Sequence, residues 1–279
     1  MENQIPTASI GIAGCGAMGL PMACRLASAG LDVWGLDIKP LDQFGDFASR
    51  MLPSPREMAA HCPVILSVVR DRAETETLCF GEGGLFTTSP YPRVFIICST
   101  LAPVDVLEIA AGLPPDAIAI DAAISGAPIA AQEGTLTVMM GGPEATTKTL
   151  MPIFTPLAQA IHHLGPLGAG MTVKVLNNFV AASTVVAVRR AFAAADSLGM
   201  DWRTLRAVME TSSGGTWFGT NYERISWANE GWEKGNTMAI LEKDVNAYLT
   251  TVKASEQRDP DPFETAVLGS LKTMPPVDR

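Results

Sequence analysis

Gly14-Cys15-Gly16-Ala17-Met18-Gly19 is the stretch of this sequence that decides its fold. The apolar run 8–13 before it is typical of a short strand, and the helix-forming residues 20–29 after it end at a glycine. A second apolar run, 31–36, is closed by Asp37. Strand, glycine loop, helix, strand and acid in this order predict the opening βαβ unit of a doubly wound sheet.

Each part of this unit is suited to a dinucleotide. Glycines at these spacings permit a tight turn, close approach of the backbone to a pyrophosphate, and close packing of helix against strand. The N-terminus of the helix supplies N–H donors and a positive dipole end. Asp37 is expected to bind the ribose hydroxyls of NAD and to repel the extra phosphate of NADP, although Lys39 nearby is compatible with NADP. The candidate cofactor contacts in the loop are Gly14, Cys15, Gly16, Ala17, Met18 and Gly19.

Strand and helix patterns continue to alternate up to about residue 142. Strands are expected at 64–69, 94–98, 117–122 and 134–142, and helices at 55–61, 72–78 and 103–111. The alternation predicts a parallel, doubly wound α/β sheet of Rossmann type, in which ligands bind at the carboxyl ends of the strands.

Two loops follow the carboxyl ends of predicted strands. Val69 and Arg70 lie in the first loop, and Thr100 lies in the second, so these three are candidate cofactor contacts. For Ser99, beside Thr100, a turn or helix-capping hydroxyl is a comparable interpretation. Ser125-Gly126-Ala127-Pro128 forms a further loop whose hydroxyl and backbone amides are suited to hold a carboxylate, with a structural turn as the alternative.

From about residue 166 the pattern becomes helical. Helices are expected at 168–198, 201–210, 216–228, 237–255 and 262–272. This change predicts an NAD-binding Rossmann-type domain at 1–165 and an all-α substrate and dimerisation domain at 166–279, joined by the long helix.

Candidate catalytic side chains lie near the start of the long helix. Lys174, Asn177 and Asn178 occupy positions i, i+3 and i+4, so they share one helical face. A solvated lysine is the alternative interpretation of Lys174. In the helical half, Trp217 is a candidate substrate contact and Lys243 a candidate cofactor contact. A tryptophan more often fills a core than touches a substrate, and a lysine is more often solvated than bound to a ligand.

Composition and charge exclude several classes of protein. The 279 residues are 47% hydrophobic and 18% charged, which is typical of a globular protein with a sizeable core. The net charge of -9 argues against a nucleic-acid partner and a polybasic membrane patch. Residues 1–5 lack the basic start of a signal peptide, and the most apolar helical segment, 181–195, is shorter than a bilayer span. Five cysteines without metal-ligand spacing indicate reduced thiols in a cytoplasmic protein and no metal site.

Five motifs occur in an order typical of one family. They are the glycine loop running into 19–23, the Ser-Thr pair at 99–100, Asp121 with its Ser-Gly and Gly-Thr-Leu-Thr segments, the glycine, lysine and asparagine segment 165–178, and Lys243-Asp244. Through these motifs the chain resembles the β-hydroxyacid dehydrogenases, which include 3-hydroxyisobutyrate, tartronate-semialdehyde, L-threonate and, more distantly, 6-phosphogluconate dehydrogenases. The resemblance covers residues 8–255, and the segments 29–35 and 214–218 are most similar to the L-threonate branch.

The resemblance implies a role for each matching residue. The implied cofactor contacts are Gly14, Gly16 and Gly19 for the pyrophosphate, Asp37 for the adenosine ribose, and Thr100 and Lys243 for the nicotinamide half. The implied substrate residues are Ser125, Gly126 and the adjacent Ala127 for the carboxylate, Asn178 for a substrate oxygen, and Lys174 as general acid/base.

The sequence departs from the family pattern at three places. Ala127 followed by Pro128 stands where the family has glycine, and Pro128 has no N–H to donate to a carboxylate. Ile97 stands where the family has an acid before the Ser-Thr pair, and the glycine-and-acid tail of the family does not follow residue 255.

These observations predict an NAD-dependent oxidoreductase that acts on a small 3-hydroxy acid of threonate or hydroxyisobutyrate type. Hydride goes to nicotinamide while a base takes the hydroxyl proton. Burial near the substrate can lower the pKa of a lysine towards neutrality, which would let Lys174 accept that proton. A reductase of the corresponding semialdehyde and a nucleotide-binding protein with little turnover are the alternatives. A homodimer or higher homo-oligomer is expected, because the helical domain is too small to cover all faces of the long apolar helix.

Overall fold

The computed structural model describes residues 9–278. Residues 1–8 and 279 lie outside the described part. Two predictions therefore fall outside it: Ala8 as the first strand residue, and the segment 1–5 as a start that lacks the features of a signal peptide. The chain forms two compact units, Met1–Lys174 and Val175–Arg279. The first is an α/β unit and helices follow it, so the predicted fold class is confirmed.

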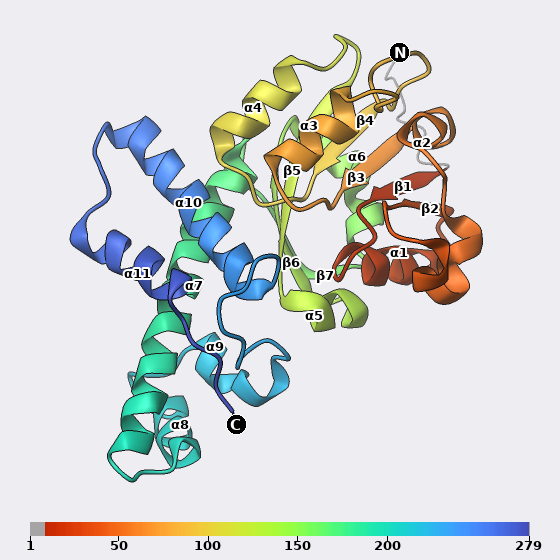
Figure 1. The fold of residues 1–279 in the computed structure, drawn as a ribbon. Coiled ribbons are helices and arrows are strands. Elements are labelled where there is room, and N and C mark those ends of the chain that lie inside the picture. The colour runs from red at the N-terminus through yellow and green to blue at the C-terminus, as the bar shows by residue number, and fades with distance from the viewer. Residues whose placement is uncertain (1–8, 279) are drawn as a thin grey trace. The chain divides into compact units, whose positions relative to one another are not determined.

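Seven strands form the sheet of the first unit (Figure 1). In chain order they are β1 (Ile10–Ala13), β2 (Val33–Leu36), β3 (Val64–Ser67), β4 (Val94–Ile97), β5 (Ile118–Ser125), β6 (Leu136–Gly141) and β7 (Ala158–His163). Their order across the sheet is β2-β1-β3-β4-β5-β6-β7. Neighbouring strands are parallel except β5 and β6, which are antiparallel. The departure arises because the short connection through α5 (Ala127–Glu133) is too small for a parallel crossover.

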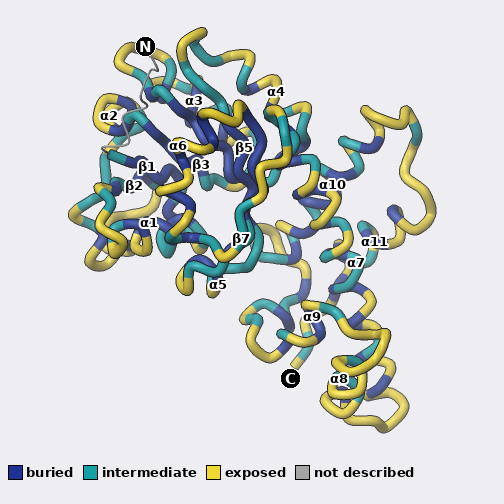
Figure 2. The backbone as a smooth tube through the Cα atoms, turned by 180° about the vertical axis from the view of Figure 1, so that it is seen from behind, coloured by how far each residue is buried: buried dark blue, intermediate teal, exposed yellow. Residues whose placement is uncertain are grey.

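Helices cover both faces of this sheet (Figure 1). Besides α5 they are α1 (Gly19–Ser28), η1 (Leu41–Arg50), α2 (Pro55–His61), α3 (Arg72–Phe80), α4 (Pro103–Ala111) and α6 (Glu144–Phe154). One apolar cluster packs α1, α5 and α6 on one face, and a second packs α2, α3 and α4 on the other. Strands β1 and β3 to β6 are buried between the two layers (Figure 2), as expected for a sheet covered on both faces.

Several elements of the first unit differ from the sequence prediction. β5 continues through Ser125, and α5 begins at Ala127, so the predicted loop is reduced to Gly126. η1, α6 and β7 had no predicted counterpart. Threonines and Pro152 hide the helical pattern of α6, and the polar residues of the edge strand β7 hide its alternation.

The second unit is built from helices. They are the rest of α7 (Ala169–Ser197), then α8 (Trp202–Glu210), α9 (Trp217–Thr220), η2 (Tyr222–Arg224), α10 (Thr237–Glu256) and α11 (Pro262–Lys272). The helix predicted at 216–228 is wrong beyond Thr220: α9 ends there, the next residue, Asn221, has φ -95° and ψ 9°, and only the short 3₁₀ turn η2 follows. Buried side chains from α7 through α11 form the core of this unit.

By length and composition alone, α7 is long and apolar enough to cross a membrane. The expectation that this helix is shorter than a bilayer span considered only residues 181–195 and is therefore wrong. In its most apolar window 44% of the residues are buried inside the protein. Phe192 of α7 packs against Trp202 and Tyr222 within the second unit. These contacts place this part of α7 in the core of the second unit.

Candidate active site

The glycine loop between β1 and α1 has the shape that a pyrophosphate requires. Gly14 has φ +92°, and a Cβ there would lie within 2.8 Å of the backbone of Val68 and Val69. A Cβ at Gly19 would overlap the carbonyl oxygen of Gly14, so the helix can start this close to the strand only with glycine. A Cβ at Gly16 would meet nothing within 4 Å, which leaves open space over the loop.

The start of α1 fits the negative charge of a dinucleotide. Its first turn contains no acidic residue within the described helix, and the first N–H groups of any helix lack intrahelical acceptors. Between these glycines, Cys15 is buried, and burial raises the pKa of its thiol to about 12. Ala17 is exposed and Met18 is half-buried on the loop. The residues present therefore fit a bound dinucleotide pyrophosphate.

Asp37 immediately follows β2, at the same end of the sheet as the glycine loop. Its Oδ1 accepts a hydrogen bond from the Lys39 backbone N–H at 3.0 Å, so the carboxylate is held in a turn. The side chain is half-buried, and Lys39 is exposed. A ribose contact by Asp37 stays a prediction that this geometry supports.

The loops after β3 and β4 are tied together by one hydrogen bond. Ser99 is buried, and its Oγ donates to the carbonyl oxygen of Val69 at 2.6 Å, which favours the structural interpretation of Ser99. Arg70 is exposed, and its backbone N–H donates to Glu74 Oε2 at 2.8 Å. Thr100 is half-buried beside this junction. Cofactor contacts by Val69, Arg70 and Thr100 remain predictions.

The segment predicted to bind the substrate carboxylate lies where β5 ends and α5 begins. Ser125 is the last residue of β5 and pairs with Thr137 of β6. Gly126 has φ +141°, and Ala127, with φ +59°, occupies the left-handed region that a residue with a Cβ rarely adopts. Pro128 lies in the first turn of α5, where its missing N–H breaks no helical hydrogen bond.

The start of α7 is held by a carboxylate from the sheet. Asp121 of β5 is fully buried; its Oδ1 accepts from the Gly168 N–H at 2.7 Å and its Oδ2 from the Met171 N–H at 2.6 Å. Burial raises the pKa of this carboxyl, and the backbone donors oppose the rise. Sequence reasoning assigned Asp121 no role. A single acid inside an otherwise apolar strand is the signal that could have identified it.

Lys174 lies on α7 one turn beyond Met171. Only 6% of Lys174 is exposed, so the solvated-lysine interpretation is wrong. Lysine side chains are seldom buried to this extent, so the burial of Lys174 sets it apart from ordinary surface lysines. Lys174 belongs to the same compact unit as the glycine loop and Ser125.

In the second unit a hydrogen-bonded group surrounds Asn178. Asn178 is buried, and its Nδ2 donates to Asp244 Oδ2 at 2.6 Å. Asn177, which is exposed, donates from Nδ2 to Asn178 Oδ1 at 3.2 Å. Lys243 Nζ lies 2.7 Å from Asp244 Oδ1 as an ion pair, so Lys243 is not merely solvated. Sequence reasoning gave Asp244 no role, although an acid directly after a candidate lysine is a usable signal.

Of the two neighbouring aromatic residues at 217 and 218, one is buried in the core and the other is exposed. Phe218 is buried and stacks on Trp227 with ring centroids 5.6 Å apart. Trp217 is 56% exposed, so the core interpretation of Trp217 is wrong. An exposed indole is available to a ligand, and substrate contact by Trp217 remains a prediction.

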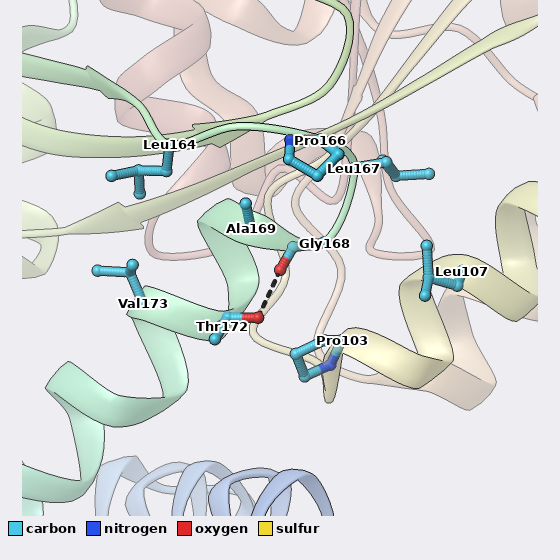
Figure 3. A pocket seen from close by; sticks show the side chains of 9 residues that line it. All are labelled: Pro103, Leu107, Leu164, Pro166, Leu167, Gly168, Ala169, Thr172 and Val173. Carbon is cyan, nitrogen blue, oxygen red and sulfur yellow. Dashed lines mark hydrogen bonds between the residues drawn. The ribbon is translucent and has the colours of Figure 1, made fainter. Parts of the chain in front are cut away.

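A separate pocket of about 440 Å³ lies in the first unit at the start of α7 (Figure 3). Its walls are mainly apolar, and the Thr172 hydroxyl donates to the carbonyl oxygen of Gly168 beside it. The lining residues are Pro103, Leu107, Leu164, Pro166, Leu167, Gly168, Ala169, Thr172 and Val173. None of the predicted site residues lines this pocket. Among residues 9–278, no three His, Cys, Asp or Glu side chains are grouped as metal ligands, and all five thiols are free.

Two family models match the chain in succession. The NAD binding domain of 6-phosphogluconate dehydrogenase matches residues 9–165. A second domain, described as NAD-binding of NADP-dependent 3-hydroxyisobutyrate dehydrogenase, matches residues 168–260.

Individual proteins are similar over most of their length. The 2-hydroxy-3-oxopropionate reductase of Escherichia coli is 30% identical over 88% of this chain and 84% of its own. The L-threonate dehydrogenase of Cupriavidus necator is 28% identical over 89% of this chain and 84% of its own. The crystal structure of a 3-hydroxyisobutyrate dehydrogenase from Salmonella typhimurium aligns with a TM-score of 0.81 at 26% identity, covering 94% of this chain and 92% of that one.

Proposed function

Because this chain belongs to the β-hydroxyacid dehydrogenases, which are NAD(P)-dependent oxidoreductases, we propose that it transfers a hydride between a C3–C4 3-hydroxy acid and NAD, with Lys174 as general acid/base. The observation that carries this proposal is the burial of Lys174 in the first turns of α7, in the compact unit that also holds the nucleotide loop. Structural lysines are seldom buried, whereas a base that must lose its proton gains from burial.

Residues of the first unit would hold the cofactor. The glycine loop would bind the pyrophosphate, Asp37 the adenosine ribose, and Val69, Arg70 and Thr100 the parts of the cofactor beyond it. Lys243, in the second unit, would contact the nicotinamide half. NADP is the second possible cofactor. When bound, NAD supplies the acceptor for the hydride that leaves the alcohol carbon.

The remaining residues would orient the acid and manage its proton. Ser125, Gly126 and Ala127 would bind the substrate carboxylate, and Asn178 and Trp217 would contact the rest of the substrate. Lys174 would accept the hydroxyl proton, so that the electrons of the O–H bond form the new carbonyl. Proton transfer to a positioned group of this kind contributes about 10²–10⁴ in rate. In the reverse direction the lysine would return the proton to the carbonyl oxygen.

The organisation of the protein follows from these roles. We propose residues 1–165 as the NAD-binding domain and 166–279 as the substrate and dimerisation domain. The boundary between the two family models, which falls between residues 165 and 168, supports this division.

Val173, Leu176 and Val180 of α7 are exposed apolar residues, which supports a homodimer or higher homo-oligomer. Five free thiols support a cytoplasmic location. Light scattering at micromolar concentration tests the assembly.

The experiment that tests the function is a substrate panel measured in both directions. Hydroxyisobutyrate, threonate, glycerate and serine are supplied with NAD or NADP, and the semialdehydes with the reduced cofactors, while nicotinamide absorbance is followed. Turnover of a 3-hydroxy acid supports the dehydrogenase. Turnover of semialdehydes alone would favour a reductase, as in the name of the Escherichia coli relative. Cofactor binding without turnover of any compound would favour the nucleotide-binding alternative.

A further inference from the structure

Asp121 makes contacts that an ordinary helix cap does not make. Ser, Thr, Asp and Asn caps usually belong to the residue just before the helix, and they satisfy one backbone donor. Asp121 instead comes from the middle of β5, and each carboxylate oxygen accepts a different N–H, from Gly168 before α7 and from Met171 in its first turn. A buried side chain of the sheet therefore holds the whole turn that begins α7.

The residues around Asp121 are closely packed. A Cβ at Gly141 of β6 would overlap Asp121 Oδ1, and a Cβ at Gly170 of α7 would lie 2.9 Å from Asp121 Oδ2 and overlap the carbonyl oxygen of Met139. Both glycines therefore allow strand, carboxylate and helix to approach one another closely. Asp121 is completely shielded from solvent.

The same strand and the same helix carry the residues proposed to act on substrate. β5 ends at Ser125, on the strand that contains Asp121. Lys174 lies one helical turn beyond Met171, and a helix transmits the position of its first turn to the next turn with little bending. Holding Met171 against β5 therefore also sets the position of Lys174 relative to Ser125.

We propose that Asp121 is a positioning residue for Lys174: its two charge-assisted hydrogen bonds hold the base at the place from which it can reach the substrate hydroxyl. This inference rests on the proposed role of Lys174 as acid/base. A displacement of about 1 Å in a catalytic group can cost about 10²-fold in rate. The loss of one of the two bonds is therefore expected to lower kcat measurably, while the nucleotide loop is untouched.

Asp121→Asn keeps the size of the side chain and replaces one acceptor oxygen by a donor group. We expect kcat, counted per NAD-binding site, to fall about tenfold or more, with the NAD Kd changed less than about threefold. Asp121→Ser, which fills less space, serves as a second variant if the asparagine protein does not fold. Glu264→Gln is the matched control, because Glu264 is a buried carboxylate that also accepts a backbone N–H at a helix start, in α11. It should lower thermal stability and leave kcat per site unchanged.

A double-mutant cycle separates positioning from a structural role. Lys174→Met is measured alone and combined with Asp121→Asn. If Asp121 acts through Lys174, the asparagine substitution will not reduce the residual rate of the methionine variant further. An equal fold-loss in both backgrounds would overturn the proposal, and so would an Asp121→Asn enzyme whose kcat per site stays within about twofold of wild type. If Lys174→Met itself keeps full turnover, the acid/base assignment fails instead, so the two failures are distinguishable.

Discussion

The side-chain amide of Asn178 donates from Nδ2 to Asp244 Oδ2 at 2.6 Å, and both side chains are buried. The short distance and the negative acceptor identify the nitrogen side of this amide, since an oxygen there would face a carboxylate. Asn178 Oδ1 in turn accepts from Asn177. The orientation of the amide is therefore set before any substrate binds.

Asp244→Asn should lower kcat/KM for the hydroxy acid, because the amide of Asn178 would lose its charged acceptor. Hydrogen bonds to charged groups contribute about 1.5–3 kcal/mol, which corresponds to a loss of about tenfold or more in kcat/KM for the hydroxy acid. Steady-state kinetics measures the effect. Asp259→Asn is the control, because Asp259 is an exposed residue in a surface ion pair with Lys253. Equal kcat/KM in the two variants would contradict a role for Asp244.

Asp37 should favour NAD over NADP, because its carboxylate attracts a ribose diol and repels a phosphate. The measurement is kcat/KM for both cofactors with one substrate. Asp37→Asn should reduce the difference between the kcat/KM values for NAD and NADP, since it removes the negative charge. The amide oxygen of asparagine can still accept the hydrogen bond from the Lys39 N–H. A wild-type preference for NADP of about tenfold or more would contradict the assignment and point to Lys39 instead.

Ala127→Gly should stabilise the protein, because Ala127 has φ +59° and a left-handed conformation costs a residue with a Cβ about 1–2 kcal/mol. At about 2–4 °C per kcal/mol for large domains, we expect a rise in Tm of about 2–8 °C. Ala130→Gly is the control, since Ala130 is a buried residue inside α5 with ordinary helical geometry and glycine there should lower Tm. Thermal unfolding of both variants measures the effect. A fall in Tm for Ala127→Gly would show that the strain is absent.

Much of the fold was predictable, because it depends on local patterns. The glycine loop and the apolar strands define β1 to β4, and α2 begins and ends as predicted at Pro55 and His61. The missed elements are those in which local signals conflict: α6 contains Pro152, and β7 carries few apolar residues on its open edge. For the site, glycines and an unusual lysine could be recognised in the sequence. The bond of Asp121 to Met171 could not, because it joins residues 50 positions apart through tertiary packing.

Glu264 should make stability depend on acid pH. The Arg258 guanidinium pairs with both of its carboxylate oxygens, at 2.7 and 2.8 Å, and together with Tyr248 lowers the pKa of Glu264 from 4.5 to about 2. A folded pKa below the ordinary value means that this stabilisation is complete above about pH 4.5 and is lost as pH falls toward 2. Tm measured against pH should fall more steeply over this window in wild type than in Glu264→Gln. Glu256→Gln, which leaves the paired oxygens intact, should follow wild type.

Lys174→Met should remove catalysis and spare folding. The methionine keeps the apolar stem in a site that is 6% exposed but cannot accept a proton, so kcat is expected to fall by about 10² or more while NAD binding survives. Lys174→Arg keeps the positive charge but cannot deprotonate, so it should retain attraction for the substrate carboxylate without restoring turnover. Rapid-mixing kinetics, with NAD affinity measured separately by titration, distinguishes these effects. An arginine variant that turns over at nearly the wild-type rate would make Lys174 an electrostatic anchor, with the base elsewhere. A methionine variant that has lost NAD binding as well would make Lys174 a structural residue, because a group that acts only on the substrate proton has no reason to affect the affinity for the cofactor.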